Sequence, residues 1–331
     1  MIDRDLKVLP EWSPQSSVWV GWPSCESLWQ GDLEPARGEV RDLVAALATS
    51  VAVRLIASGP SAVASAEANC GRFASIVDIP MGDIWIRDTG PLYILERTGL
   101  VGVVFRFNGW GEKYNIPGDQ DIALAMLATD HVSARPRDFV LEGGAVDHDG
   151  HGCLMTTKQC MLNTNRNPDL SKAGIEARLL DCFGGDRIIW LDQGIVGDHT
   201  DGHIDNLARF VGKGRVICQR PSGPDDPNEH IFAAAERELR TAGLDVMTIA
   251  SPGHIRDTAG NTMPASHLNF VFANDKIIMP VFEDRFSAIA VADLQRAMPE
   301  FDVLARPARH ILTGGGAFHC ITQQVPERGG A

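Results

Sequence analysis

The sequence predicts an α/β fold assembled from repeated units, arranged as a repeat array or a propeller. Five segments share one layout: a polar or glycine-bearing start, a short apolar strand, a turn and a second strand. Between them lie segments with the apolar spacing of amphipathic helices. A polar residue recurs in successive units, with steps of 54, 61, 64 and 53 residues between Asp88, Glu142, His203, His267 and Cys320. Periods of this size indicate that each unit contributes one strand end to a shared centre.

The hairpins are recognised by their turns, because glycine, asparagine and aspartate accept the backbone angles that tight turns need. The hairpin segments begin, in chain order, at Arg87, Glu142, His203, Ser266 and His319, and the last one is truncated. The predicted turns are Arg97-Thr98-Gly99, Asp149-Gly150-His151-Gly152, Lys213-Gly214 and Asn274-Asp275.

Helices are predicted over residues 34–50, 171–183 and from Asp226 to Ala242. The first two place apolar residues on one face, and Gly184 closes the second. The third has Asp226 as N-cap, Pro227 at N1 and Glu229 at N3, with Gly243 as its stop. Short strands are predicted at 51–57, 75–79 and 187–191. No linker divides the chain, so we expect one domain over residues 1–331.

Composition limits the function classes. The net charge of −13 argues against nucleic-acid binding, which needs clustered Lys and Arg, and suits a small cationic substrate. The seven cysteines form no C-x-x-C pair, so a disulfide scaffold is not expected. The N-terminal residues lack the pattern of a signal peptide, and no apolar run approaches the roughly 20 residues that span a bilayer. We expect a cytoplasmic protein without a membrane partner.

Five residues stand out as a possible catalytic set. Cys320 follows the glycine run 314–316, whose backbone can approach a ligand closely. Upstream lie Asp88, Glu142, His203 and Asp205. A thiol, an imidazole and three carboxylates can together bind a cationic group, attack it and move its protons.

Other residues are expected to border this site. Trp85 would provide an apolar or cation–π wall beside Asp88. The alternative is that Trp85 is an ordinary core residue at a strand end. Trp110, in the loop FNGWG, and Gly315 are further candidates for substrate contact. His203 and Asp205 are two residues apart, so on a strand they would face the same side.

Zinc is the main alternative to metal-free chemistry. Cys320, His203 and Asp205 would supply three ligands. However, neither H-E-x-x-H nor paired C-x-x-C spacing is present, and we therefore predict no metal and no cofactor.

Taken together, the strings WIRDTGP, LEGG, NRNP, TDGHIDNLARF, SHLNFVFAN and GGGAFHCITQQ resemble the agmatine deiminase and bacterial-type peptidylarginine deiminase family. The resemblance spans about residues 12–326. It implies a β/α propeller with five-fold pseudosymmetry (a pentein), and a possible homodimer. It further implies that Cys320 is the nucleophile, that Asp88 and Asp205 hold a guanidinium, and that Glu142 and His203 complete the site. The implied reaction is hydrolysis of agmatine to N-carbamoylputrescine and ammonia.

Two alternatives stay open at this point. One is a deiminase of another guanidino compound: arginine, a peptidyl arginine or a methylarginine. The other is a non-catalytic guanidino or polyamine-binding protein, although binding alone needs no nucleophile. Agmatine-specific relatives usually have glutamate where this chain has His199. We still predict a cationic substrate tail. In the motif segments around Asp88, Glu142, His203 and Cys320, the only cations that could pair with a substrate carboxylate are Arg87 and Arg209. Arg87 should point to the opposite face from Asp88.

Overall fold

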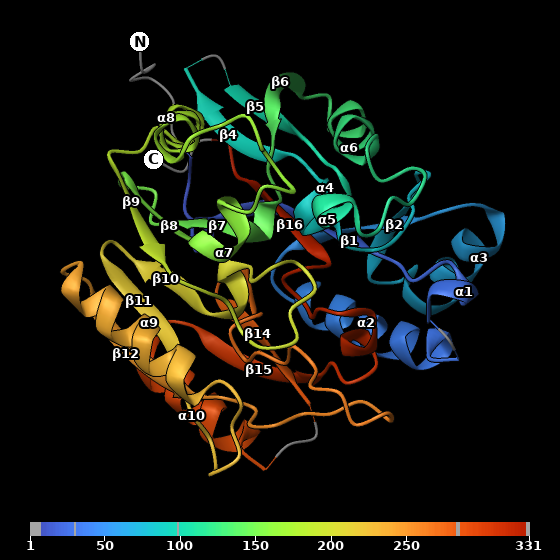
Figure 1. The fold of residues 1–331 in the computed structure, drawn as a ribbon. Coiled ribbons are helices and arrows are strands. Elements are labelled where there is room, and N and C mark those ends of the chain that lie inside the picture. Colours follow the sequence, from blue (N-terminus) through green and yellow to red (C-terminus); the bar gives the residue numbers. More distant parts are fainter. Residues whose placement is uncertain (1–7, 30, 98, 283–284, 329–331) are drawn as a thin grey trace.

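In the computed structural model, which describes residues 8–29, 31–97, 99–282 and 285–328, small sheets surround a common centre (Figure 1). The described residues form five sheets, one of four strands and four of three strands. The predicted α/β propeller with five repeated units is therefore confirmed. Thr98 in the first predicted turn lies outside the described residues.

Each three-stranded sheet has the same plan. An antiparallel hairpin comes first, and a helical crossover then adds a third strand parallel to the second. This is the connection that parallel pairing demands, because its strands cannot be joined by a tight turn. The sheets contain β4 (Leu92–Glu96), β5 (Gly99–Arg106) and β6 (Ser133–Val140); β7 (Val146–His148), β8 (Cys153–Thr157) and β9 (Arg187–Leu191); β10 (Ala208–Gly212), β11 (Arg215–Arg220) and β12 (Asp245–Ala250); β13 (Val271–Ala273), β14 (Lys276–Val281) and β15 (Asp302–Pro307).

The four-stranded sheet joins the two ends of the described chain. β16 (Thr322–Pro326) pairs antiparallel with β1 (Gln15–Gly21), and in Figure 1 the red strand lies beside the blue one. β1 then pairs in parallel with β2 (Ala52–Ala57), which pairs with β3 (Ala74–Asp78). The truncated fifth unit of the sequence is thus completed by N-terminal strands.

The helices lie mainly where the apolar periodicity predicts them, but one begins later than expected. Asp226 accepts hydrogen bonds from the amides of Ser222 and Asn228, so it orders the turn before the helix, and Asn228 becomes the N-cap. The helices are α1 (Glu26–Trp29), α2 (Leu33–Leu47), α3 (Pro60–Cys70), α4 (Ile86–Thr89), α5 (Gly109–Glu112), α6 (Ile122–Asp130), α7 (Lys158–Met161), α8 (Lys172–Phe183), α9 (Glu229–Thr241) and α10 (Ser287–Ala297), with 3₁₀ turns η1 (Gly143–Ala145), η2 (Ile204–Asn206) and η3 (Ile311–Gly314).

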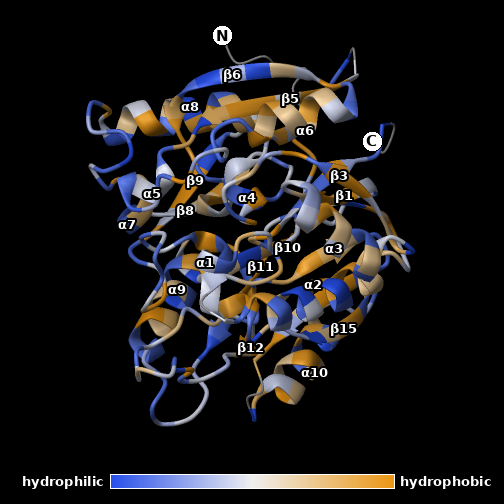
Figure 2. Ribbon diagram, turned by 90° about the vertical axis from the view of Figure 1, so that its right-hand side faces the viewer, coloured by the Kyte–Doolittle hydropathy of each residue, from blue (hydrophilic) through white to orange (hydrophobic). Residues whose placement is uncertain are grey.

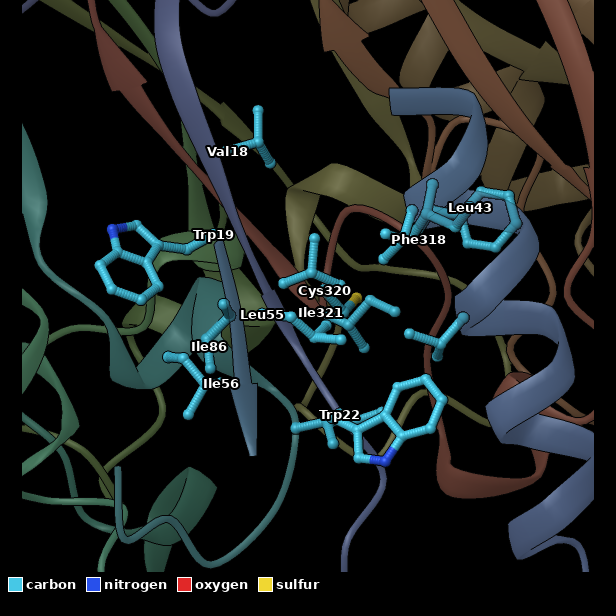
Figure 3. Close-up of a cluster of buried hydrophobic side chains, with 14 of the residues drawn as sticks. Val18, Trp19, Trp22, Leu43, Leu55, Ile56, Ile86, Phe318, Cys320 and Ile321 are labelled. Carbon is cyan, nitrogen blue, oxygen red and sulfur yellow. The ribbon is translucent and has the colours of Figure 1, made fainter. Parts of the chain in front are cut away.

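The largest apolar core lies between β1, β2 and α2 and extends to the segment that carries Cys320 (Figure 3). Along α2, Val40, Leu43, Val44 and Leu47 are fully buried, while hydrophilic colour marks other parts of the helix in Figure 2. Burial of each such side chain contributes about 1.5–3 kcal/mol. This packing fixes the backbone from which the thiol projects.

None of the helices in the described ranges is both long and apolar enough to cross a membrane. The single domain over 1–331, the cytoplasmic location and the homodimer stay predictions.

Candidate active site

The predicted catalytic side chains converge at the centre of the ring. Asp88 lies on α4, Glu142 directly precedes η1, and Cys320 lies just before β16. His203 and Asp205 lie at η2, and all five residues are buried.

Gly144 lets three of these side chains approach one another. A Cβ at Gly144 would lie 2.7 Å from His203 Nδ1 and 3.0 Å from both Asp205 Oδ2 and Asp88 Oδ1. No side chain fits at this position, so a glycine is required for the carboxylates and the imidazole to meet.

The local geometry differs from the prediction in two places. Asp88 lies on a single helical turn, not at a strand end. His203 directly precedes the 3₁₀ turn η2 and Asp205 lies within it, so strand alternation is the wrong reason for their proximity. Gly202, directly before His203, has a φ of +91°, which is incompatible with a continuous strand and which glycine adopts readily.

The two aspartates are held differently. Asp88 Oδ1 accepts a hydrogen bond from the Gly144 amide at 2.8 Å, and Oδ2 accepts one from Trp110 Nε1 at 2.9 Å. Asp205 Oδ2 lies 2.8 Å from His319 Nδ1. Among the described residues, nothing donates to Asp205 Oδ1, although that oxygen is buried. A buried acceptor without a donor is costly, so this oxygen is ready to accept one from a ligand.

His203 and Glu142 form a buried pair. His203 Nε2 lies 3.5 Å from Glu142 Oε2, and His203 Nδ1 lies 3.7 Å from Asp88 Oδ1. Burial alone would lower the pKa of His203, but the Asp88 charge and the hydrogen bonds of Cys160 and Glu142 outweigh it, and the pKa is raised well above its usual value. Burial alone would raise the pKa of Glu142, but hydrogen bonds and charge from His203 and Arg166 lower it. The pair is therefore an imidazolium beside a carboxylate.

The Cys320 thiol lies between apolar and acidic surroundings. Figure 3 shows it beside Ile321 within the main apolar cluster. Its Sγ lies 3.1 Å from Asn269 Nδ2 and 3.7 Å from Asp205 Oδ2. Burial, followed by the charges of Asp205 and Asp88, raises the pKa of Cys320 well above its usual value. A cation bound between these carboxylates would reverse that effect.

A pocket of about 250 Å³ leads to Asp88 and Cys320. Trp85, Trp110 and Gly315 also line it, as the sequence predicts for substrate-contacting residues. His203, Glu142 and Asp205 lie deeper, behind this lining. The rest of the lining is formed by Leu28, Asp83, Tyr114, Ile116, His199, Thr200, Thr313, Gly314 and Gly316. Of these, Tyr114 and His199 are exposed and mark the outer end.

Comparison of the sequence with known proteins identifies the family of this chain. Residues 7–326 match the Porphyromonas-type peptidyl-arginine deiminase family. The chain belongs to this family. An agmatine deiminase from Stutzerimonas stutzeri is 36% identical, with 96% of this chain and 94% of that protein covered. The resemblance that the sequence motifs indicate is thus confirmed.

Solved structures agree with this deiminase over nearly its whole length. A variant of the C. jejuni agmatine deiminase with substrate bound has a TM-score of 0.91 at 29% identity and covers 98% of this chain and 97% of its own. The Enterococcus faecalis agmatine deiminase has a TM-score of 0.90 at 27% identity, with 98% and 96% covered.

Sequence reasoning missed several residues of the deiminase that support the site. Arg166, in the segment NTNRNP, was not among the predicted site residues, and its Nε lies 3.0 Å from Glu142 Oε1. His267, the periodic residue of the fourth unit, instead contacts the Ala250 carbonyl, while Asn269 reaches the thiol. The sequence feature that could have indicated Arg166 is its positive charge within NTNRNP, a turn-rich segment with no other charged residue.

The zinc alternative is not supported in its predicted form. The described residues whose ligand atoms all lie within 4.8 Å of one another are Glu142, Cys160 and His203, not the set with Cys320 and Asp205. The Arg166 guanidinium already pairs with Glu142, and its positive charge opposes a divalent cation there.

Proposed function

We propose that this deiminase acts on agmatine, converting it to N-carbamoylputrescine and ammonia. The observation that carries this proposal is a buried thiol next to two carboxylates, at the end of a pocket that has a third carboxylate in its lining. Such a site suits a small molecule with a guanidinium at one end and an ammonium at the other. Proteins named agmatine deiminases match almost the whole chain, which supports the same substrate.

The guanidinium is held by Asp88 and Asp205. A planar guanidinium has several N–H groups that pair well with carboxylates. Asp205 lies beside Cys320 through its Oδ2, and its buried Oδ1 has no donor among the described residues, so this carboxylate can accept further hydrogen bonds. Asp88 is kept in place by Trp110, whose left-handed backbone (φ of +54°) marks a constrained position. The substrate plane is thereby fixed over the thiol.

Binding the cation also prepares the nucleophile. Without substrate, burial and then the charges of Asp205 and Asp88 raise the pKa of Cys320 and keep its thiol protonated. A guanidinium between the carboxylates offsets their charge and favours the thiolate. Substrate binding and activation of Cys320 are therefore coupled.

The thiolate attacks the guanidinium carbon, and a C–S bond forms. His203, as an imidazolium, gives a proton to the departing nitrogen, the C–N bond breaks, and ammonia leaves an S-alkylthiouronium. His203, now neutral, takes a proton from water, whose oxygen attacks the same carbon. The C–S bond then breaks, the ureido product is released, and Cys320 is regenerated. Glu142 stabilises the imidazolium form of His203 throughout.

The substrate tail is proposed to be cationic. Asp83 is a third carboxylate in the lining of the pocket, and burial raises its pKa to about 6, so it is mostly ionised at neutral pH. Among the described residues that line this pocket there is no Lys or Arg to pair with the carboxylate of free arginine. Arg87 and Arg209 both pair with Glu11, away from this pocket. Lys113 contacts Asp201 and the carbonyl of His199.

A substrate panel tests the proposal. Ammonia release is measured with agmatine, arginine, a peptidyl arginine and a methylarginine at matched concentrations. Agmatine should have the highest kcat/KM. A preference for another guanidino compound would reject agmatine but keep the deiminase activity. Tight agmatine binding with no ammonia release would identify a non-catalytic binding protein.

A further inference from the structure

Behind Asp205, away from the substrate pocket, lies a buried chain of alternating charges. His319 Nδ1 lies 2.8 Å from Asp205 Oδ2, and His319 Nε2 lies 2.7 Å from Glu11 Oε1. The histidine therefore joins a carboxylate next to the nucleophile to one from the segment before β1. His319 is almost fully buried.

Glu11 is held on several sides. Its Oε2 lies 2.5 Å from Arg209 NH2, and its Oε1 lies 3.2 Å from Arg87 NH1. Arg87 NH1 also donates to Gln324 Oε1 at 2.8 Å, on β16. Glu11 and Arg87 line a small cavity of about 30 Å³, whereas neither lines the substrate pocket. Glu11 is thus a rigid anchor that touches no substrate.

The contacts also constrain the protons on His319. A carboxylate can only accept hydrogen bonds, and each ring nitrogen of His319 faces one. Each contact is a hydrogen bond only when the ring nitrogen that faces the carboxylate carries hydrogen. Burial alone would raise the pKa of Asp205, but the hydrogen bond and charge of His319 outweigh it and lower the pKa.

We propose that His319, anchored by Glu11, is a positioning residue that holds the Asp205 carboxylate beside Cys320 through its Oδ2. The inference rests on the proposed role of Asp205 as a guanidinium ligand. It adds that the orientation of the Asp205 side chain is fixed by His319 and Glu11, which do not contact the substrate.

Two substitutions at His319 separate positioning from packing. In His319→Asn, the side-chain amide nitrogen takes the place of Nδ1, so it can still donate to Asp205 while the bond to Glu11 is lost. In His319→Gln, the amide nitrogen reaches the place of Nε2, so it can donate to Glu11 while the bond to Asp205 is lost. Both variants lose the imidazole ring, and glutamine fills the space better than asparagine.

The readouts are kcat and KM for agmatine, the Kd of agmatine in a Cys320→Ser background, and the Tm of each variant. We expect His319→Gln to lose about 10- to 100-fold more kcat/KM than His319→Asn, the range for a hydrogen bond to a charged group. The Kd of agmatine should weaken in the same order. A purely structural role predicts the opposite order, because the better-filling glutamine would be the milder change.

Equal losses in the two variants, or a larger loss in His319→Asn, would overturn the inference. If His319→Gln does not fold, His319→Leu takes its place, because leucine has a similar size and neither donor, and the same order is expected. The proposed function has a separate test: absence of ammonia release by the wild-type protein would reject that function, whereas an active wild type with the wrong order of variants rejects only the role of His319.

Discussion

The two ends of the substrate pocket are built in opposite ways. At the inner end, Asp88, His203 and Cys320 are buried and come from different units of the propeller. At the outer end, Tyr114 is 44% exposed and stacks on the exposed ring of His199, with centroids 6.2 Å apart. The inner groups are fixed by charged hydrogen bonds, and the outer ones lie on loops.

This difference separates the reaction from the choice of substrate. Buried charges in a low-dielectric site interact strongly and tolerate little change. Exposed loop residues interact weakly and can be replaced at little cost to folding. We therefore expect substitutions at the inner end to abolish turnover for every guanidino compound, and those at the outer end to change only the ranking of substrates.

The largest effect is expected at Cys320. Cys320→Ser should lower kcat by at least about 1000-fold, because the C–S bond can no longer form. Agmatine should still bind, since Asp88 and Asp205 remain, and isothermal calorimetry measures this. Retention of a tenth of the wild-type rate would exclude Cys320 as the nucleophile.

The carboxylates should give the next largest effect. Asp205→Asn and Asp88→Asn each remove a charge-assisted hydrogen bond of about 1.5–3 kcal/mol, so both affinity and turnover should fall. The loss should be similar for agmatine and for butylguanidine, which has no ammonium. Normal affinity in both variants would mean that the guanidinium binds elsewhere.

Glu142→Gln should change the pH dependence. The first half-reaction needs the imidazolium of His203, so kcat/KM should decline as pH rises through the raised pKa of His203. Removal of the Glu142 charge lowers that pKa, so the alkaline decline should begin at a lower pH. Unchanged pH limits in this variant would contradict the assigned pair, and Asp201→Asn, which leaves Glu142 in place, is the control.

A smaller and more selective effect is expected at Asp83 and His199, in the lining of the pocket. Asp83→Asn should lower kcat/KM for agmatine by roughly 5-fold, the effect of one partly exposed ion pair, and leave butylguanidine nearly unchanged. His199→Glu should raise the preference for agmatine over arginine. Equal losses for both guanidines in Asp83→Asn would show that the two ends are not separable.

The smallest effect is expected from metal removal. Incubation with EDTA followed by gel filtration should leave kcat/KM for agmatine unchanged, because the proposed mechanism assigns every proton transfer to side chains. Activity that is lost and then restored by zinc would revive the metal alternative.

The same contrast explains what the sequence predicts. Hairpins, helices and the five catalytic candidates could be read from local features: turn residues, apolar spacing, and a thiol after glycines. The supporting residues could not, because their partners are remote: Glu11 and His319 are 308 positions apart, and Asn269 and Cys320 are 51 apart. Local rules also failed at Asp226 and at His203, where a carboxylate–amide turn and a glycine, respectively, replaced the expected element.

The pairing of β16 with β1 has a consequence for the time at which activity appears during synthesis. Cys320 lies at the start of the last unit, and its sheet is completed by the first strand made. Such long-range contacts form late, because a large loop must close before they stabilise the fold. A nascent chain still emerging from the ribosome therefore carries Asp88 and Asp205, the proposed guanidinium ligands, before it carries Cys320, the proposed nucleophile. We therefore expect deimination only after the ring of sheets has closed. Incomplete translation products should release no ammonia.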